Sequence, residues 1–170
     1  MTSPITPKYR MLTQSELKSL EKDFIYYLAS HGISADRWQE IQEGHPDQER
    51  RKLIEFSDLV LQRAYSKCRL VEEVSTNGWL FYFFDDDKGQ IDLIGFVASE
   101  ESNLDFRNVS KNEILNYIQN ENDAVISIIR ASKPQQPDKA NEIHLMLERG
   151  AFISRDLEMF DKIKKLTGDV

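Results

Sequence analysis

The chain has 170 residues, 40% hydrophobic and 30% charged, which is typical of a soluble globular protein with a real core. No apolar run approaches the ~18 residues of a membrane span, and the N-terminus lacks a basic or apolar leader. We therefore expect no membrane partner and no secretory signal. Cys68 is the only cysteine, which excludes an internal disulfide and favours a cytoplasmic location.

The net charge of −7 is concentrated in the middle of the chain. Residues 75–123 contain three basic and ten acidic side chains, whereas the flanking segments are almost neutral. An acidic field repels phosphate backbones, and no basic stripe with interleaved aromatic residues occurs. We expect no nucleic-acid partner, and we expect any protein partner to present a basic surface.

The N-terminal part of the chain predicts an arm followed by a helix. Residues 1–11 include two prolines and indicate an extended arm. Thr13 can cap a helix, and Glu16, three residues later, completes a capping box. Apolar residues then recur at helical spacing, and the helix is expected to end near Gly32.

Two more helices are predicted before the middle of the chain. Ser34 is the expected cap of a short helix that ends near Gly44, and Asp47 is the expected cap of a longer one. The segment Leu70–Val74 either prolongs this longer helix or forms a strand. The turn that follows favours a strand, because a lone hairpin needs a third strand for stability.

The middle of the chain predicts an antiparallel β-meander. Asn77-Gly78 separates Leu70–Val74 from the aromatic run Trp79–Phe84, and this dipeptide is a strong hairpin signal. A second turn, Asp85–Gly89, precedes the apolar segment Ile91–Val97 and ends in a glycine suited to a positive φ.

The segment after the meander predicts a loop, a helix and another strand. Residues 100–108 are polar and indicate a loop, and Ser110 with Glu113 forms a second capping box. Asn120–Asp123 should break that helix. Ala124–Ala131 is rich in Val and Ile, which favours a fourth strand, with a helix as the alternative.

The C-terminal part predicts two helices. Lys133–Pro137 is expected to be a loop, Asp138 caps a helix that ends at Gly150, and Ser154 caps the last helix. The predicted fold is therefore α+β, with N-terminal helices, a small antiparallel sheet of three or four strands, and C-terminal helices. Residues 12–170 are expected to form a single domain.

Three fragments together resemble a known family. They are Lys8-Tyr-Arg-Met-Leu-Thr13, with the pattern K-Y-x-x-L-T, then Ile33–Trp38, and near the end Glu142–Ser154. The combination resembles a family of small uncharacterised bacterial proteins. The resemblance implies a bacterial, cytoplasmic, single-domain protein. That family has no established activity, so the resemblance assigns no catalytic or binding residue.

The residues that could carry catalysis or bind metal lack the motifs that such chemistry needs. His31, His45 and His144 have no second ligand at zinc spacing, and Cys68 has no nucleophile elbow or glycine-framed oxyanion hole nearby. The cluster Asp85–Asp87 lacks the spaced ligands of a calcium loop. Glycine-rich phosphate loops are absent from the sequence. We predict no catalytic residue, no metal site and no cofactor.

The aromatic run suggests a binding surface, because alternate side chains of a strand point to opposite faces and both faces are apolar here. Either helices of the chain cover both faces, or another protein covers one of them. Exposed aromatic area next to acidic groups is typical of a steered protein interface. The residues of the predicted binding surface are Trp79, Phe81, Phe83, Asp85, Asp86 and Asp87.

These observations favour a non-enzymatic protein-interaction module that binds a basic partner or forms a homodimer. The alternative is an enzyme or a small-ligand-binding regulatory protein with a pocket between the sheet and the helices. A deep polar pocket would favour the alternative, and a flat aromatic patch above ~600 Å² would favour the interaction module.

Overall fold

The computed structural model describes residues 5–100, 102–120 and 125–168. The chain divides into two compact units, Met1–Ser66 and Lys67–Val170. The first unit is helical, and the second contains a β-sheet with helices, so the predicted α+β class is confirmed. The single domain expected over residues 12–170 stays a prediction.

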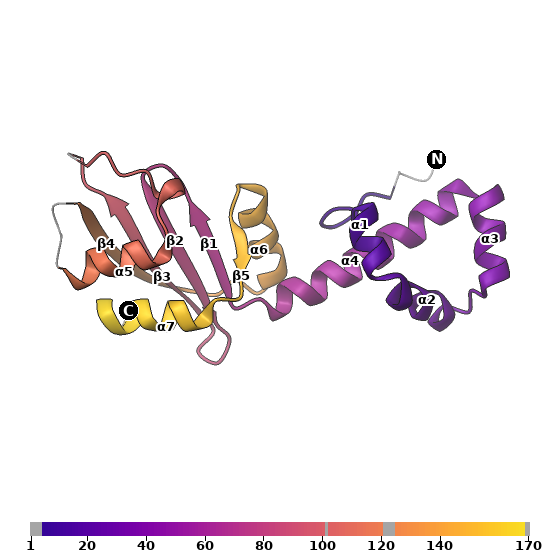
Figure 1. The fold of residues 1–170 in the computed structure, drawn as a ribbon. Coiled ribbons are helices and arrows are strands. Elements are labelled where there is room, and N and C mark those ends of the chain that lie inside the picture. Colours follow the sequence, from indigo (N-terminus) through magenta and orange to yellow (C-terminus); the bar gives the residue numbers. More distant parts are fainter. Residues whose placement is uncertain (1–4, 101, 121–124, 169–170) are drawn as a thin grey trace. The chain divides into compact units, whose positions relative to one another are not determined.

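The first unit is built from four helices, shown in indigo to magenta in Figure 1. Aromatic rings join three of them, because the Phe24 ring lies 5.2 Å from that of Trp38 and 4.9 Å from that of Phe56. Edge-on and tilted contacts of this kind stabilise a core beyond the area they bury. The helices are α1 (Gln14–Ser19), α2 (Glu21–Ser30), α3 (Ala35–Gly44) and α4 (Pro46–Lys67).

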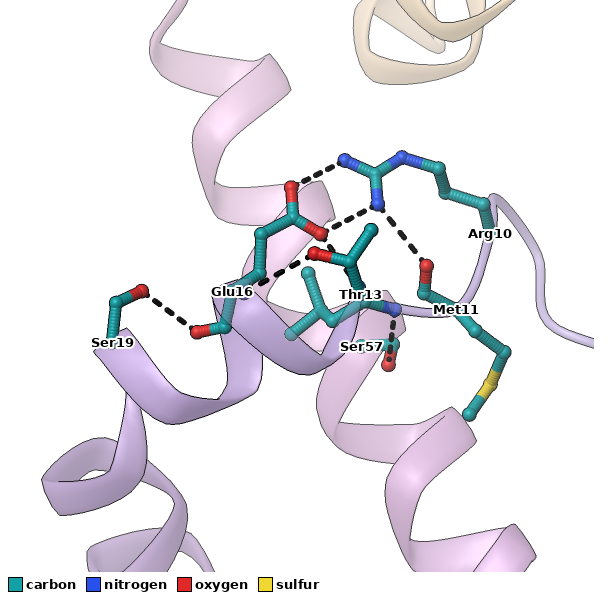
Figure 2. Close-up of polar contacts among 7 residues, drawn as sticks. Arg10, Met11, Thr13, Glu16, Ser19 and Ser57 are labelled. Carbon is teal, nitrogen blue, oxygen red and sulfur yellow. Dashed lines mark hydrogen bonds and ion pairs between the residues drawn. The ribbon is translucent and has the colours of Figure 1, made fainter.

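The predicted capping box at the first helix is confirmed. Thr13 Oγ1 accepts from the Glu16 backbone N–H at 3.2 Å, and Glu16 Oε2 accepts from the Thr13 N–H at 2.8 Å. Figure 2 shows the Arg10 guanidinium facing the same carboxylate, with Nη1 and Nη2 at 2.8 and 2.7 Å. One side chain thus satisfies a free N–H at the helix start and also binds the arm that precedes it.

The described part of the N-terminal arm lies along α4. The carboxylate of Asp58 accepts from the backbone N–H groups of Lys8 and Tyr9 at 2.9 and 3.1 Å. Ser57 Oγ accepts from the N–H of Leu12 at 3.1 Å, and Tyr9 and Leu12 are both buried. The predicted arm therefore has a fixed position over these residues, while residues 1–4 lie outside the described part of the chain.

Two helix boundaries in this unit differ from the prediction. The long helix expected from the first capping box is interrupted at Leu20, which separates α1 from α2. The expected cap Asp47 lies inside the first turn of α4, which begins at Pro46. Proline suits this first position because its missing N–H would have no intrahelical partner there. The predicted cap Ser34 is confirmed, since it accepts from the N–H of Arg37.

The second unit contains a five-stranded antiparallel sheet with the strand order β4-β3-β2-β1-β5. The prediction that Leu70–Val74 forms a strand is confirmed, and the register pairs Leu70 with Phe83 and Val74 with Trp79. The strands are β1 (Leu70–Val74), β2 (Gly78–Asp85), β3 (Gln90–Ala98), β4 (Ile126–Pro134) and β5 (Phe152–Ser154).

The second predicted turn has the expected glycine geometry. Gly89 has a φ of 63°, the left-handed region that side chains other than glycine rarely adopt. Asp85 Oδ1 accepts from the N–H of Lys88 at 3.2 Å and closes the same turn. At the other turn, Gly78 is already the first residue of β2.

The ends of the sheet differ most from the prediction. The predicted fourth strand is confirmed as β4, which continues through Pro134, so the loop expected from Lys133 starts later; Ala124 lies outside the described residues. The edge strand β5 was not predicted. Ser154 belongs to β5, and the last helix is instead capped by Asp156, which accepts from the N–H of Met159.

Three α-helices and a short 3₁₀ turn accompany the sheet. The capping box of Ser110 and Glu113 is confirmed, as is the cap Asp138, which accepts from the N–H of Asn141. The break predicted over Asn120–Asp123 falls mostly outside the described residues. The 3₁₀ turn lies within the segment that was expected to be a loop. The elements are η1 (Phe106–Asn108), α5 (Lys111–Gln119), α6 (Lys139–Glu148) and α7 (Leu157–Thr167).

The two faces of the sheet are covered by different helices (Figure 1). One face, here the α5/α7 face, packs against α5 and α7, and the other, here the α6 face, packs against α6. The strand register places on the α5/α7 face Leu70, Glu72, Trp79, Phe81, Phe83, Asp92, Ile94 and Phe96. The α6 face carries Val71, Glu73, Leu80, Tyr82, Phe84, Ile91 and Leu93.

The α5/α7 face forms the main core of the second unit. Phe81, Ile94 and Phe96 of the sheet are fully buried, and Ile114 and Ile163 from the two helices lie against them, both without exposed area. Burial of apolar surface on this scale is the dominant favourable term in folding. The α6 face is covered by one helix, and Val71, Phe84 and Ile143 are buried there.

Candidate functional site

A cavity of about 220 Å³ lies between α6 and the sheet in the second unit. Four of its lining residues come from four different strands, two come from α6, and one is the residue directly after α6. Its size is below the range of ~300–1,000 Å³ that is usual for drug-sized ligands. The lining residues are Glu73, Tyr82, Ile91, Lys133, Glu142, Met146 and Arg149.

The sheet side of the cavity follows a diagonal across the strands. Tyr82 pairs with Val71, two residues before Glu73, and Ile91 pairs directly with Lys133. Because alternate residues share a face, these positions all lie on the α6 face. Tyr82 donates its hydroxyl hydrogen to Glu73 Oε2 over 3.3 Å, a long and weak hydrogen bond.

The helix side of the cavity results from helical spacing. Glu142, Met146 and Arg149 are four and three residues apart, which places them on one side of α6. The Nζ of Lys133 lies 2.6 Å from Glu142 Oε1, so an ion pair joins the edge strand β4 to the helix above it. The cavity is thus bounded by two elements that are held together by charge.

The lining carries two carboxylates and two cations. Burial is the main cause that raises the pKa of Tyr82; the nearby Glu73 carboxylate raises it further, and Arg149 opposes the rise. The hydroxyl therefore stays protonated at neutral pH and acts as a hydrogen-bond donor. Ile91 and Met146 add apolar surface, so the cavity combines both signs of charge with an apolar wall.

Two lining groups have hydrogen-bonding capacity that the described part of the chain does not use. Glu142 Oε2 is buried and has no hydrogen-bond partner there. Arg149 donates from Nε to the Leu145 carbonyl at 3.1 Å, and no described residue accepts from its two Nη groups. The unpartnered Glu142 Oε2 is costly because it is buried, whereas Arg149 is exposed and solvent can satisfy its Nη groups.

The aromatic residues of the predicted binding surface are not at the surface. Trp79 and Phe81 are buried in the core on the α5/α7 face, with 8% and 0% of their area exposed. Phe83 is half-buried and stacks on Phe160 of α7, with 5.0 Å between the ring centroids. Helices α5 and α7 cover these rings, which is the first of the two arrangements that the sequence left open.

The acidic residues of that surface lie at the turn between β2 and β3. Asp85 closes the turn, and Asp87 is exposed. Both carboxylate oxygens of Asp86 lie 2.8 Å from Nζ of Lys139, a buried side chain that also lies over the Phe84 ring at 5.5 Å. Asp86 thus attaches the start of α6 to the sheet.

A buried charge on the α5/α7 face escaped the sequence analysis. Glu72 has no exposed area; its Oε1 lies 2.7 Å from Nζ of Lys111, and its Oε2 accepts from Nε1 of Trp79 at 2.9 Å. The same Lys111 ammonium lies 3.2 Å from Asp156, the cap of α7. The register places the neighbouring Glu73 on the opposite face of the sheet.

The thiol and the histidines lie apart from the cavity lining. Burial is the main cause that raises the pKa of Cys68, so its thiol is protonated at neutral pH. His31 Nδ1 lies 2.8 Å from the Tyr27 carbonyl oxygen at the end of α2, and His144 Nε2 lies 3.5 Å from Glu148 on α6. These are local contacts within helices.

Over the described ranges, no three His, Cys, Asp or Glu side chains are placed so that they could hold a metal ion. None of the helices in those ranges combines the length and the apolar character that crossing a bilayer requires.

None of the polar residues that line the cavity was predicted from the sequence to be a site residue. Glu73, Tyr82, Lys133 and Glu142 come from segments up to 69 positions apart, and no short motif links them. One signal was available in the sequence, since strand alternation places Tyr82 on the face opposite to Phe81 and Phe83.

The comparisons with known proteins agree with the family resemblance and identify no activity. No curated protein and no solved structure matches the sequence. A family model described as a family of unknown function, DUF6495, matches residues 7–168. This match spans both units and all of the elements described above. The chain belongs to this family of unknown function.

Proposed function

We propose that the second unit binds a small polar molecule in the cavity between α6 and the sheet, and that the protein is a non-enzymatic ligand-binding module. The observation that supports this most directly is the convergence of Glu73, Tyr82, Lys133, Glu142 and Arg149 on one cavity of about 220 Å³. A few convergent polar groups over an apolar wall are typical of small-molecule sites.

Binding is favoured over catalysis by the chemistry of the lining. The seven lining residues include no serine, threonine, cysteine or histidine. The Tyr82 hydroxyl has a raised pKa, which makes it a stable donor and a poor acid. Two of the charged groups, Lys133 and Glu142, neutralise each other at 2.6 Å. These groups can recognise and orient a molecule, and none of them is paired with a histidine or cysteine of the lining.

The ligand-binding alternative is also better supported than the protein interface first expected. The aromatic half of that interface, Trp79 and Phe81 with the half-buried Phe83, packs against α5 and α7. Asp86 is bound to Lys139 within the same unit. A partner that docked on these residues would have to displace contacts that already stabilise the fold.

The proposal is tested by filling the cavity. A defined library of polar metabolites is screened by ligand-observed NMR against the full chain and two variants. Met146→Trp places a large ring in the cavity lining, whereas Leu145→Trp adds the same ring at the neighbouring position of α6, which is 45% exposed. We expect at least one compound to bind the wild type and Leu145→Trp but not Met146→Trp. If no compound binds, or if binding survives Met146→Trp, the proposal is wrong.

A further inference from the structure

Building on the proposed function, we infer that the ligand of this cavity is a zwitterion of amino-acid size, with one ammonium group, one carboxylate group and an apolar side chain. The inference rests on the charge balance, the unused hydrogen-bonding capacity and the size of the cavity. It deepens the proposed function by naming the class of ligand.

The charges of the lining favour a ligand that carries both signs. Glu73 and Glu142 contribute two negative charges, and Lys133 and Arg149 contribute two positive charges. The lining has no net charge, so a ligand with only an ammonium or only a carboxylate would use one of its two signs and not the other. A zwitterion gains an opposite charge at each end, and complementarity of this kind gives specificity.

The carboxylate of the ligand is matched by Arg149. The two Nη groups of a guanidinium form a planar fork that fits a carboxylate with two parallel hydrogen bonds. In Arg149 the Nε donor is used by the Leu145 carbonyl, which orients the guanidinium at the end of α6. Arg149 is exposed and no described residue accepts from the Nη fork, so its donors are accessible to a ligand carboxylate.

The ammonium of the ligand is matched by Glu142. Its Oε1 is paired with Lys133, whereas its Oε2 is buried and accepts from no described residue. The terminal torsion of a glutamate is broad, so a small rotation can present either oxygen to a ligand in the cavity that Glu142 lines. An ammonium donor placed there forms a charge-assisted hydrogen bond, which is about twice as strong as a neutral one.

The volume of the cavity limits the size of the molecule. At about 220 Å³ the cavity is smaller than the ~300–1,000 Å³ that is usual for drug-sized ligands. A free amino acid is of this size, whereas a nucleotide is too large. Ile91 is buried and Met146 half-buried in the lining, and these two apolar side chains favour an apolar side chain on the ligand.

The experiment removes one charge of the ligand at a time. L-leucine and L-methionine are titrated calorimetrically into the full chain, and each is compared with its N-acetyl derivative and its amide. The N-acetyl derivative lacks the ammonium, and the amide lacks the carboxylate. We expect the free amino acids to bind at least about tenfold more tightly than either derivative, because a polar site rejects an analogue that leaves its groups unpaired.

Protein variants assign each end of the ligand to a residue. Arg149→Gln should weaken binding of the free amino acid much more than binding of the amide, since the amide has no carboxylate for Arg149 to bind. Glu142→Gln should weaken binding of the free amino acid more than binding of the N-acetyl derivative, since that derivative has no ammonium for Glu142 to bind. Arg155→Gln and Glu148→Gln are matched controls, because both residues are exposed and neither lines the cavity. Neither control should change any affinity.

The outcomes separate this inference from the proposed function. If the derivatives bind as tightly as the free amino acids, the ligand is not recognised as a zwitterion. The same holds if only another class of polar compound binds and Met146→Trp blocks it. In both cases the inferred ligand class is wrong and the ligand-binding function stands. If nothing binds, both are wrong. If Glu142→Gln fails to fold, the comparison of free and derivatised ligands on the wild type still decides.

Discussion

Two adjacent glutamates of β1 lie on opposite faces of the sheet and differ in burial and in their contacts. Glu72 has no exposed area and is held by Lys111 and Trp79, whereas Glu73 is half-buried beside the cavity and contacts the Tyr82 hydroxyl. Both carboxylates belong to β1, and their faces differ only because alternate side chains of a strand point in opposite directions.

The difference is determined by the helices that cover each face. Two helices, α5 and α7, cover the first face, and their starts supply both Lys111 and Asp156 around the buried charge. A single helix, α6, covers part of the second face, where Leu80 and Leu93 stay half-buried and Ile129 is 41% exposed. The first face is therefore closed by its helices, whereas the second face carries the cavity.

The strongest test of this contrast removes the cation from the buried carboxylate. Lys111→Met leaves Glu72 buried with only Trp79 as a partner. Breaking a buried ion pair on one side costs about 3–5 kcal/mol, and we expect a loss near the lower limit because the lysine side chain is 21% exposed. The free energy of unfolding from urea titrations, followed by circular dichroism, measures the effect.

The control for Lys111→Met is Lys162→Met, which breaks the exposed pair between Lys162 and Glu158 on α7. Exposed pairs contribute about 0–1 kcal/mol, so little change is expected there. The double variant Glu72→Met/Lys111→Met should be more stable than Lys111→Met alone, because the uncompensated charge is gone. Equal losses for Lys111→Met and Lys162→Met would show that Glu72 does not depend on its cation.

A second test changes the packing of the α6 face. A Cβ atom on Gly95 would lie 2.6 Å from Leu80 Cδ2 and 2.7 Å from Ile129 Cγ1, so both side chains would have to move. We expect Gly95→Ala to lower the free energy of unfolding by about 1–2 kcal/mol, which is typical of overpacking. Gly44→Ala is the control, since a Cβ there meets no atom within 4 Å. A stable Gly95→Ala would mean that this face is loosely packed.

Local features of this fold were predictable because they depend on neighbours in the sequence. The capping boxes at Thr13 and Ser110 and the left-handed Gly89 each follow from residues within a few positions. The strand Leu70–Val74 was predicted from the hairpin signal that follows it. These predictions required no knowledge of the tertiary contacts.

The cavity and the buried charge were not predictable in the same way. Strand alternation does not reveal which helix covers which face, so the sequence could not show that Trp79 is buried while Tyr82 lines a cavity. The ion pair of Lys133 with Glu142 depends on the register of β4 and the position of α6. The strand β5 was missed because three residues are too few for a periodic pattern.

A third test compares two neighbouring carboxylates at the tip of the β2–β3 turn. Asp86→Asn leaves the buried Lys139 ammonium without its opposite charge, and we expect a loss of about 1 kcal/mol in the free energy of unfolding. The loss should be smaller than that of Lys111→Met because Asp86 is 50% exposed and water compensates in part. Asp87→Asn is the matched control, and equal effects of the two variants would show that Asp86 does not anchor α6.

The smallest effect is expected for Glu16, an exposed carboxylate in the first unit. It shows how much less an exposed ion pair contributes than the buried pair of Glu72. The hydrogen bond from Arg10 is the main cause that lowers the pKa of Glu16 to about 2, from 4.5. A lowered pKa contributes stability that is present above about pH 4.5 and is lost as the pH falls through about 2. The side chain is 38% exposed, so solvent screening reduces this contribution to less than about 1 kcal/mol.

Glu16→Gln removes this titration, and hydrogen exchange of the α1 and α2 amides measures its effect. We expect the wild type to be more stable than Glu16→Gln between pH 5 and pH 7 and the difference to shrink toward zero near pH 2, since the protonated Glu16 resembles the glutamine. Arg10→Met should weaken the pH dependence of the wild type, because it removes the main cause of the lowered pKa. A constant difference down to pH 2 would mean that the contact between Arg10 and Glu16, shown in Figure 2, contributes nothing through its charge.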